Sequence, residues 1–88
     1  MSDDVPIATH EELVDLLREI DGLRDKGKVH PAFHYKSRAF LHFHGDERGY
    51  YADVRFGDDF EPVRAATPTE RADLIRRVRA HVDGHRRR

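Results

Sequence analysis

Histidines in the middle of this sequence are spaced so that they could carry chemistry. His42 and His44 flank Phe43 in a segment whose apolar and polar residues alternate as in a β-strand. Residues two apart on a strand share a face, so the two imidazoles can converge on one ion. With His34 and Asp53 as predicted neighbours across a sheet, four nitrogen and oxygen ligands would suit zinc or a similar divalent metal. A His–Asp contact across strands is also an ordinary stabilising pair, so a solvated sheet face is the alternative.

Aromatic side chains give a second candidate site. Residues 33–56 hold all three tyrosines and four of the five phenylalanines. Most of these rings alternate into the predicted core, but Phe40 and Tyr51 are expected on the opposite face, together with Arg55 and Lys36. A face that mixes aromatic and basic side chains suits a protein partner, a second copy of the chain, or the bases of a nucleic acid.

Antiparallel hairpins are expected to position these residues. Three short strands are predicted, at residues 33–35, 39–44 and 50–56. Residues 60–64 add a candidate fourth strand, which Pro62 confines to the sheet edge. The side-chain period of two then puts the apolar residues of the strands on one face and the candidate site residues on the other.

One amphipathic helix is predicted before the strands in the chain and another after them. The first, residues 9–21, begins at the capping box Thr9-His10-Glu11-Glu12. The second, residues 68–83, begins at the capping box Thr67-Pro68-Thr69-Glu70 and stops at Gly84. The predicted fold class is therefore α+β, a three- to four-stranded antiparallel meander with both helices packed on one face.

Composition limits the classes of protein to consider. The 88 residues are expected to form one domain, with residues 1–8 and 84–88 as mobile tails. The 16 basic and 17 acidic residues nearly balance, which argues against general affinity for nucleic acid. The lack of cysteine excludes disulfides and thiolate metal sites. No membrane contact is expected, since no apolar run has the length of a membrane span. The N-terminus lacks the order of a signal peptide, so a cytoplasmic location is expected.

The block from Pro31 to Phe56 resembles the middle of the MmcQ/YjbR-like family. In both, an aromatic strand leads into a short basic turn, here Lys36-Ser37-Arg38, and then into Ala39-Phe40-Leu41 and a return strand. The glycine usual in the family's first turn is missing, and this chain is shorter than typical members. The family resembles double-wing DNA-binding proteins, so the resemblance implies a nucleic-acid role. It transfers no site residue.

Three functions follow from these patterns. The first is a non-enzymatic binding or interaction module, a homodimer through the outward sheet face or an edge strand. The second is a divalent-metal-binding protein or metal-dependent enzyme that uses the four candidate ligands above. The third is nucleic-acid binding through Lys36, Arg38, Arg48 and the C-terminal arginines. The sequence contains no glycine-rich phosphate loop and no pattern of a catalytic triad.

Overall fold

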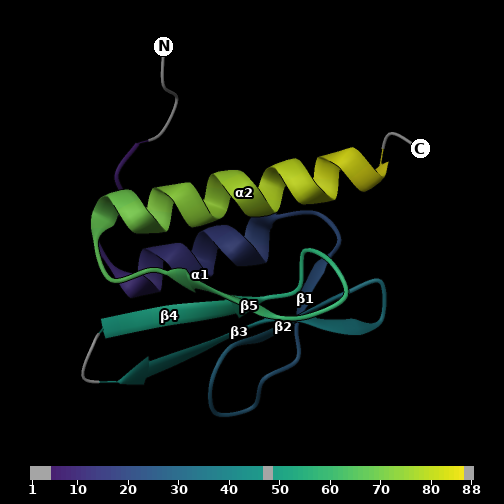
Figure 1. Cartoon of the computed structure of the whole chain (residues 1–88), viewed down its shortest axis with the longest axis horizontal. Coiled ribbons are helices and arrows are strands. Elements are labelled where there is room, and N and C mark those ends of the chain that lie inside the picture. The colour runs from purple at the N-terminus through teal and green to yellow at the C-terminus, as the bar shows by residue number, and fades with distance from the viewer. Residues whose placement is uncertain (1–4, 47–48, 87–88) are drawn as a thin grey trace.

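Two helices lie on one face of a five-stranded antiparallel sheet in the computed structural model, which describes residues 5–46 and 49–86 (Figure 1). The elements are, in chain order, α1 (His10–Glu19), β1 (Leu23–Asp25), β2 (Ala32–Tyr35), β3 (Arg38–Asp46), β4 (Gly49–Val54), β5 (Glu61–Arg64) and α2 (Pro68–Arg86). Neighbouring strands in the sheet are also neighbours in the chain. The predicted α+β meander is confirmed, but it has five strands where three or four were expected.

Side-chain caps start both helices. The Thr9 hydroxyl accepts a hydrogen bond from the Glu12 amide at 3.1 Å. In α2 the capping box is reciprocal, because Thr67 Oγ1 accepts from the Glu70 amide and the Glu70 carboxylate accepts from the Thr67 amide, each at 3.1 Å. The predicted end of α2 at Gly84 is wrong, since the helix continues to Arg86. A glycine inside a helix costs only about 1 kcal/mol, so it need not end one.

Gly22 turns the chain from α1 directly into the edge strand β1. Its φ of 100° is easily reached only by glycine. The Leu23 amide donates to the Ile20 carbonyl at 3.2 Å and closes a four-residue turn. A Cβ at position 22 would also lie 3.4 Å from the Tyr35 ring. Strand β1 follows at once, and no strand was predicted from the sequence before residue 33.

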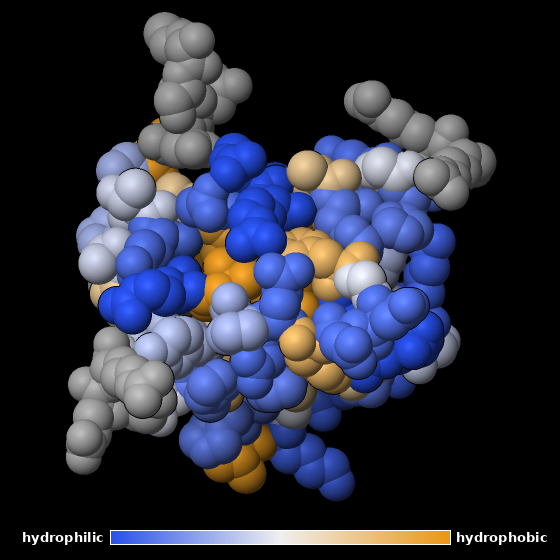
Figure 2. Space-filling view, viewed as in Figure 1, coloured by the Kyte–Doolittle hydropathy of each residue, from blue (hydrophilic) through white to orange (hydrophobic). Residues whose placement is uncertain are grey.

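The hydrophobic core lies between the helices and the sheet. Leu13 and Leu17 of α1 and Leu74 and Val78 of α2 are fully buried. The strands contribute buried side chains to the same core: Leu23, Phe33, Phe40, Leu41, Ala52, Val54 and Val63. Figure 2 shows hydrophobic residues also reaching the surface in the middle of the view, over the helical layer, with hydrophilic residues around them. No helix within the described residues is long and apolar enough to span a membrane.

The segment before α1 packs against α2. Ile7 is buried, and its amide donates to the Pro68 carbonyl at 3.1 Å. The Arg71 guanidinium donates to the carbonyl oxygens of Ile7 and Ala8 at 3.0 and 3.1 Å. Residues 7 and 8, assigned to a mobile tail by the sequence, therefore belong to the packed domain. Residues 84–86 of the second predicted tail belong to α2, and residues 1–4 and 87–88 lie outside the described part of the chain.

A β-bulge in β3 sets the direction of Phe40. The register between β2 and β3 shifts after Phe33, which leaves Phe40 as an extra residue on β3. Its side chain is 3% exposed and its ring stacks on His81 of α2, with 5.4 Å between centroids. The prediction that Phe40 lies on the outward face is wrong, because the period of two fails where one extra residue enters a strand.

Candidate functional site on the outer face of the sheet

The outer face, the side of the sheet turned away from α1 and α2, brings several of the predicted site residues together. Residues paired across strands share a face. Two such rows cross the middle of the sheet, His42–Asp53–Pro62 and His44–Tyr51–Arg64. Both helices lie on the other side (Figure 1). The histidines, the aspartate and the tyrosine singled out from the sequence therefore lie on one surface.

Asp53 links the two histidines. Its Oδ2 atom lies 3.1 Å from Nε2 of His42 and 3.2 Å from Nε2 of His44. One carboxylate oxygen thus lies within ion-pair distance of both imidazoles. The two imidazole side chains are 47% and 45% exposed. The pair forms a fixed surface of two rings that a ligand can reach.

Ring and cation contacts extend this surface in both directions. His44 stacks on Tyr51, with centroids 5.3 Å apart and planes 18° apart. On the other side, His42 meets the Phe60 ring at 5.2 Å. The Arg55 guanidinium lies 4.4 Å from the Phe60 centroid, within the range of a cation–π contact. We call this contiguous set the outer row: Arg55, Phe60, His42, Asp53, His44 and Tyr51.

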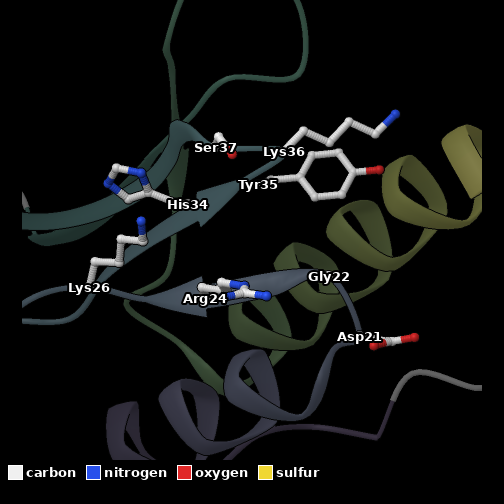
Figure 3. Close-up of a pocket in the computed structure, with 8 residues that line it drawn as sticks. All are labelled: Asp21, Gly22, Arg24, Lys26, His34, Tyr35, Lys36 and Ser37. Carbon is white, nitrogen blue, oxygen red and sulfur yellow. The ribbon is translucent and has the colours of Figure 1, made fainter.

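A basic hollow of about 540 Å³ lies beside β1 and β2 (Figure 3). Arg24 and His34 are cross-strand partners there. Figure 3 shows the side chains of Arg24, Lys26 and His34 gathered on one side of the hollow. Its lining has three cationic side chains and one carboxylate: Asp21, Gly22, Arg24, Lys26, His34, Tyr35, Lys36 and Ser37. The hollow therefore favours an anion.

The four predicted metal ligands do not form one cluster. His34 on β2 pairs with Arg24 and Ala39, whereas Asp53 on β4 is separated from it by β3. The prediction that His34 and Asp53 are neighbours is wrong, because β3 pairs with both of their strands. Within residues 5–46 and 49–86, no group of three or more histidine, cysteine, aspartate or glutamate side chains is arranged to hold a metal ion. A zinc site on the outer face stays a prediction without support from the geometry.

The predicted binding residues divide between two surfaces. Tyr51 and Arg55 belong to the outer row, whereas Phe40 is buried in the core. Lys36 is exposed in the turn between β2 and β3, and its ammonium lies 5.5 Å from the Tyr35 ring centroid. Sequence reasoning missed Phe60 as a site residue. The sequence pattern that could have identified it is its position two residues before Pro62, because residues two apart in an extended segment lie on the same face of the sheet.

Arginines singled out for nucleic-acid binding are only partly described. Arg38 opens β3 and is exposed. Arg48, Arg87 and Arg88 lie outside the described residues, as does the side chain of Arg86.

No family model matches this chain, and no curated protein or solved structure matches it either. The resemblance to the MmcQ/YjbR-like family therefore stays a prediction. A function for this chain has to be argued from its own surface chemistry.

Proposed function

We propose that this chain is a non-enzymatic binding module whose outer face binds single-stranded nucleic acid. The observation that carries the proposal is the outer row, in which four rings and one guanidinium lie in contact on a sheet face without a covering helix. Bases of a single strand stack on exposed rings with little regard to sequence. The exposed imidazoles of His42 and His44 add polar groups that can form hydrogen bonds with base edges.

Charge on the outer face suits a phosphate backbone. Arg55 lies at one end of the outer row, and Arg24 and Lys26 line the basic hollow beyond the other strands. The carboxylate of the row, Asp53, is engaged by two imidazoles. The chain has a formal charge of −1, but the acidic first turn of α1 lies in the helical layer on the other side of the sheet. The outer face and the hollow therefore carry local positive charge although the whole sequence is nearly balanced.

The dimensions also fit. The hollow lies beside β1 and β2, most of the outer row lies on β3 and β4, and three strand spacings lead from β1 to β4. At about 4.8 Å per strand spacing, this crossing covers about 14 Å. RNA-binding sheets stack two or three bases on a surface of this kind. A short single strand lying across the sheet would place bases on the row and phosphates at the hollow.

The outer face suits a second copy of the chain less well. Self-association was predicted from two exposed rings, Phe40 and Tyr51, and Phe40 is buried. A two-fold contact places each surface patch against its own copy. Such a contact would bring the cations of the face towards each other without an excess of carboxylates to oppose them. An anionic ligand has the complementary charge.

Fluorescence anisotropy with labelled ten-nucleotide RNA and DNA single strands tests the proposal. Tyr51→Ala is expected to weaken binding about tenfold, because stacking contributes about 1–3 kcal/mol per base. Arg24→Gln is expected to weaken binding as well, whereas Arg79→Gln, the same charge change on exposed α2, leaves it unchanged. With three phosphate contacts, log affinity should fall with log salt at a slope of about −2. Circular dichroism confirms that each variant is folded.

Equal effects of Arg24→Gln and Arg79→Gln would overturn the proposal, as would binding that does not change with salt. Analytical ultracentrifugation of the same proteins tests whether a second copy of the chain occupies the outer face instead. A dimer that Tyr51→Ala dissociates, together with no binding of either single strand, would assign the face to a second copy of the chain. A monomer that binds the strands supports the proposal.

A further inference from the structure

We infer that His81 and His85, near the C-terminal end of α2, form a binding site for a divalent transition-metal ion. The two histidines are four residues apart, so they lie on one face of the helix on successive turns. Their ring centroids are 4.3 Å apart. Histidine pairs with this spacing on a helix chelate metal ions in proteins. This site shares no residue with the outer row and does not depend on the proposed function.

The hydrogen bond of His85 presets it as a ligand. Its Nδ1 atom lies 2.8 Å from the main-chain carbonyl oxygen of His81. A carbonyl only accepts, so Nδ1 carries the proton and Nε2 has its lone pair free. Metal-binding histidines generally donate their other ring N–H to a carbonyl or carboxylate in this way. The His85 side chain is also exposed, so an ion can reach it.

Ring packing holds His81 beside His85. The His81 ring stacks on Phe40 at 5.4 Å and meets Phe56 at 5.5 Å between centroids. An imidazole held in place in this way loses little freedom when it binds an ion, so it suits the role of a ligand.

Tyr35 supplies an oxygen donor beside the pair. Its ring centroid is 6.0 Å from those of both His81 and His85. Figure 3 shows its hydroxyl pointing towards the C-terminal turns of α2. This hydroxyl is buried and has no hydrogen-bond partner within the described residues. Leaving a buried hydroxyl unpaired is unfavourable, and an ion with its bound water would satisfy it.

The donor set selects the class of ion. Two imidazole nitrogens and one phenolic oxygen suit Cu²⁺, Ni²⁺ and Zn²⁺ and are poor ligands for Ca²⁺ or Mg²⁺. Metal–nitrogen bonds of about 2.0–2.1 Å place two coordinated imidazoles at a centroid separation of roughly 5 Å. The observed 4.3 Å is close to this value, so a small rotation of the exposed His85 ring completes the geometry.

Isothermal titration of the full chain, without an affinity tag, with Cu²⁺, Ni²⁺ and Zn²⁺ tests the inference. Cu²⁺ is expected to bind most tightly, following the usual order for nitrogen ligands. His85→Gln is expected to weaken Cu²⁺ binding at least tenfold, because it removes one of two nitrogen donors. His44→Gln, on the outer face, is the matched control and should leave the affinity within twofold. Lys36→Gln should tighten binding, since it removes a nearby positive charge.

Paramagnetic broadening in an amide NMR spectrum locates the ion independently. With Cu²⁺ below one equivalent, signals of residues 81–85 and of Tyr35 should broaden first, and a chelator should restore them. Broadening centred on His42 and His44 would overturn the inference. An affinity that His85→Gln leaves unchanged, with the fold intact by circular dichroism, would overturn it as well.

Discussion

Asp25 fixes the edge of the sheet through four hydrogen bonds. Its Oδ1 atom accepts from the amides of Gly27 and Ala32 at 3.0 and 3.2 Å. Its Oδ2 atom accepts from Nε and from a terminal nitrogen of Arg18 on α1, at 3.1 and 3.0 Å. One carboxylate thus holds β1, the following loop and α1 together. Because Arg24 of β1 lines the basic hollow, Asp25 also positions part of the candidate site.

We predict that Asp25→Asn lowers the free energy of unfolding by about 1–2 kcal/mol at pH 7, since hydrogen bonds to a charged group are lost. Burial alone would raise the pKa of the Asp25 carboxyl, but the hydrogen bonds from Gly27, Ala32 and Arg18 lower it overall. A carboxyl whose pKa is lower in the folded state stabilises the fold above its ordinary pKa of about 4. This stabilisation is lost as pH falls through the lowered pKa.

Urea unfolding at pH 7 and pH 3 measures this effect. The difference between Asp25→Asn and the unchanged chain should shrink at the lower pH. Asp15→Asn is the matched control, because Asp15 makes one exposed ion pair with Arg18 and its side chain is 69% exposed. Its effect should stay within about 0.5 kcal/mol. Equal losses in the two variants would contradict the role given to Asp25.

Elements with a local signal could be predicted from the sequence, and those set by distant contacts could not. The capping boxes at Thr9 and Thr67 predicted both helix starts, since a cap involves only neighbouring residues. Strand β1 has three residues, too few for an alternating pattern, and depends on Asp25 and Arg18. The bulge at Phe40 arises from how β2 pairs with β3. Nothing local in the sequence marks it.

The same distinction applies to the candidate site. Alternation along β3 and β4 predicted that four residues share the outer face: His42, Asp53, His44 and Tyr51. The structure has this register. The contact of Arg55 and Phe60 depends on the path of the loop between β4 and β5. The predicted neighbours His34 and Asp53 required the strand order as well as the register. The faces of β4 and of β3 beyond the bulge were therefore predictable, but which strands lie side by side was not.

Helix α2 depends on its reciprocal cap, and Thr67 provides the test. Its hydroxyl accepts from the Glu70 amide, and the Glu70 carboxylate also accepts from the Ala66 amide and from Nε of Arg64, at 3.0 and 2.9 Å. We predict that Thr67→Ala lowers the free energy of unfolding by about 1 kcal/mol. Thr69→Ala, an exposed position inside the helix, is the control. Thermal unfolding that shifts equally in both variants would contradict the prediction.

At the scale of the whole molecule, the sheet separates two kinds of histidine. His42 and His44 are exposed on the outer face and engage Asp53. His10 of α1 and His81 of α2 lie on the covered side and contact aromatic rings. His10 meets Phe43 and Tyr50, each at 4.7 Å between centroids. Acid should therefore affect the packing of the helices on the sheet through His10 and His81.

The pKa values of both packed histidines are lowered. Burial lowers the pKa of His10, with a further contribution from the charge of Arg71 that Glu11 partly opposes. Burial also lowers the pKa of His81, with contributions from His85 and Lys36. The unfolded chain then binds protons more readily than the folded one below the ordinary histidine pKa of about 6.5. The contribution of the two neutral histidines to the free energy of unfolding is complete above that pH. It is lost as pH falls through the lowered pKa values of His10 and His81.

We therefore predict that the free energy of unfolding decreases between pH 7.5 and 5.5, before the carboxyls titrate. Urea unfolding at half-unit pH steps measures the decrease. His81→Gln should reduce the pH dependence by removing one of the two groups, even where it lowers stability at every pH. Thr69→Ala, an exposed change that removes no titratable group, should leave the dependence unchanged. A profile that is flat from pH 7.5 to 5.5 would show that the folded chain accepts protons on His10 and His81 without cost to its packing.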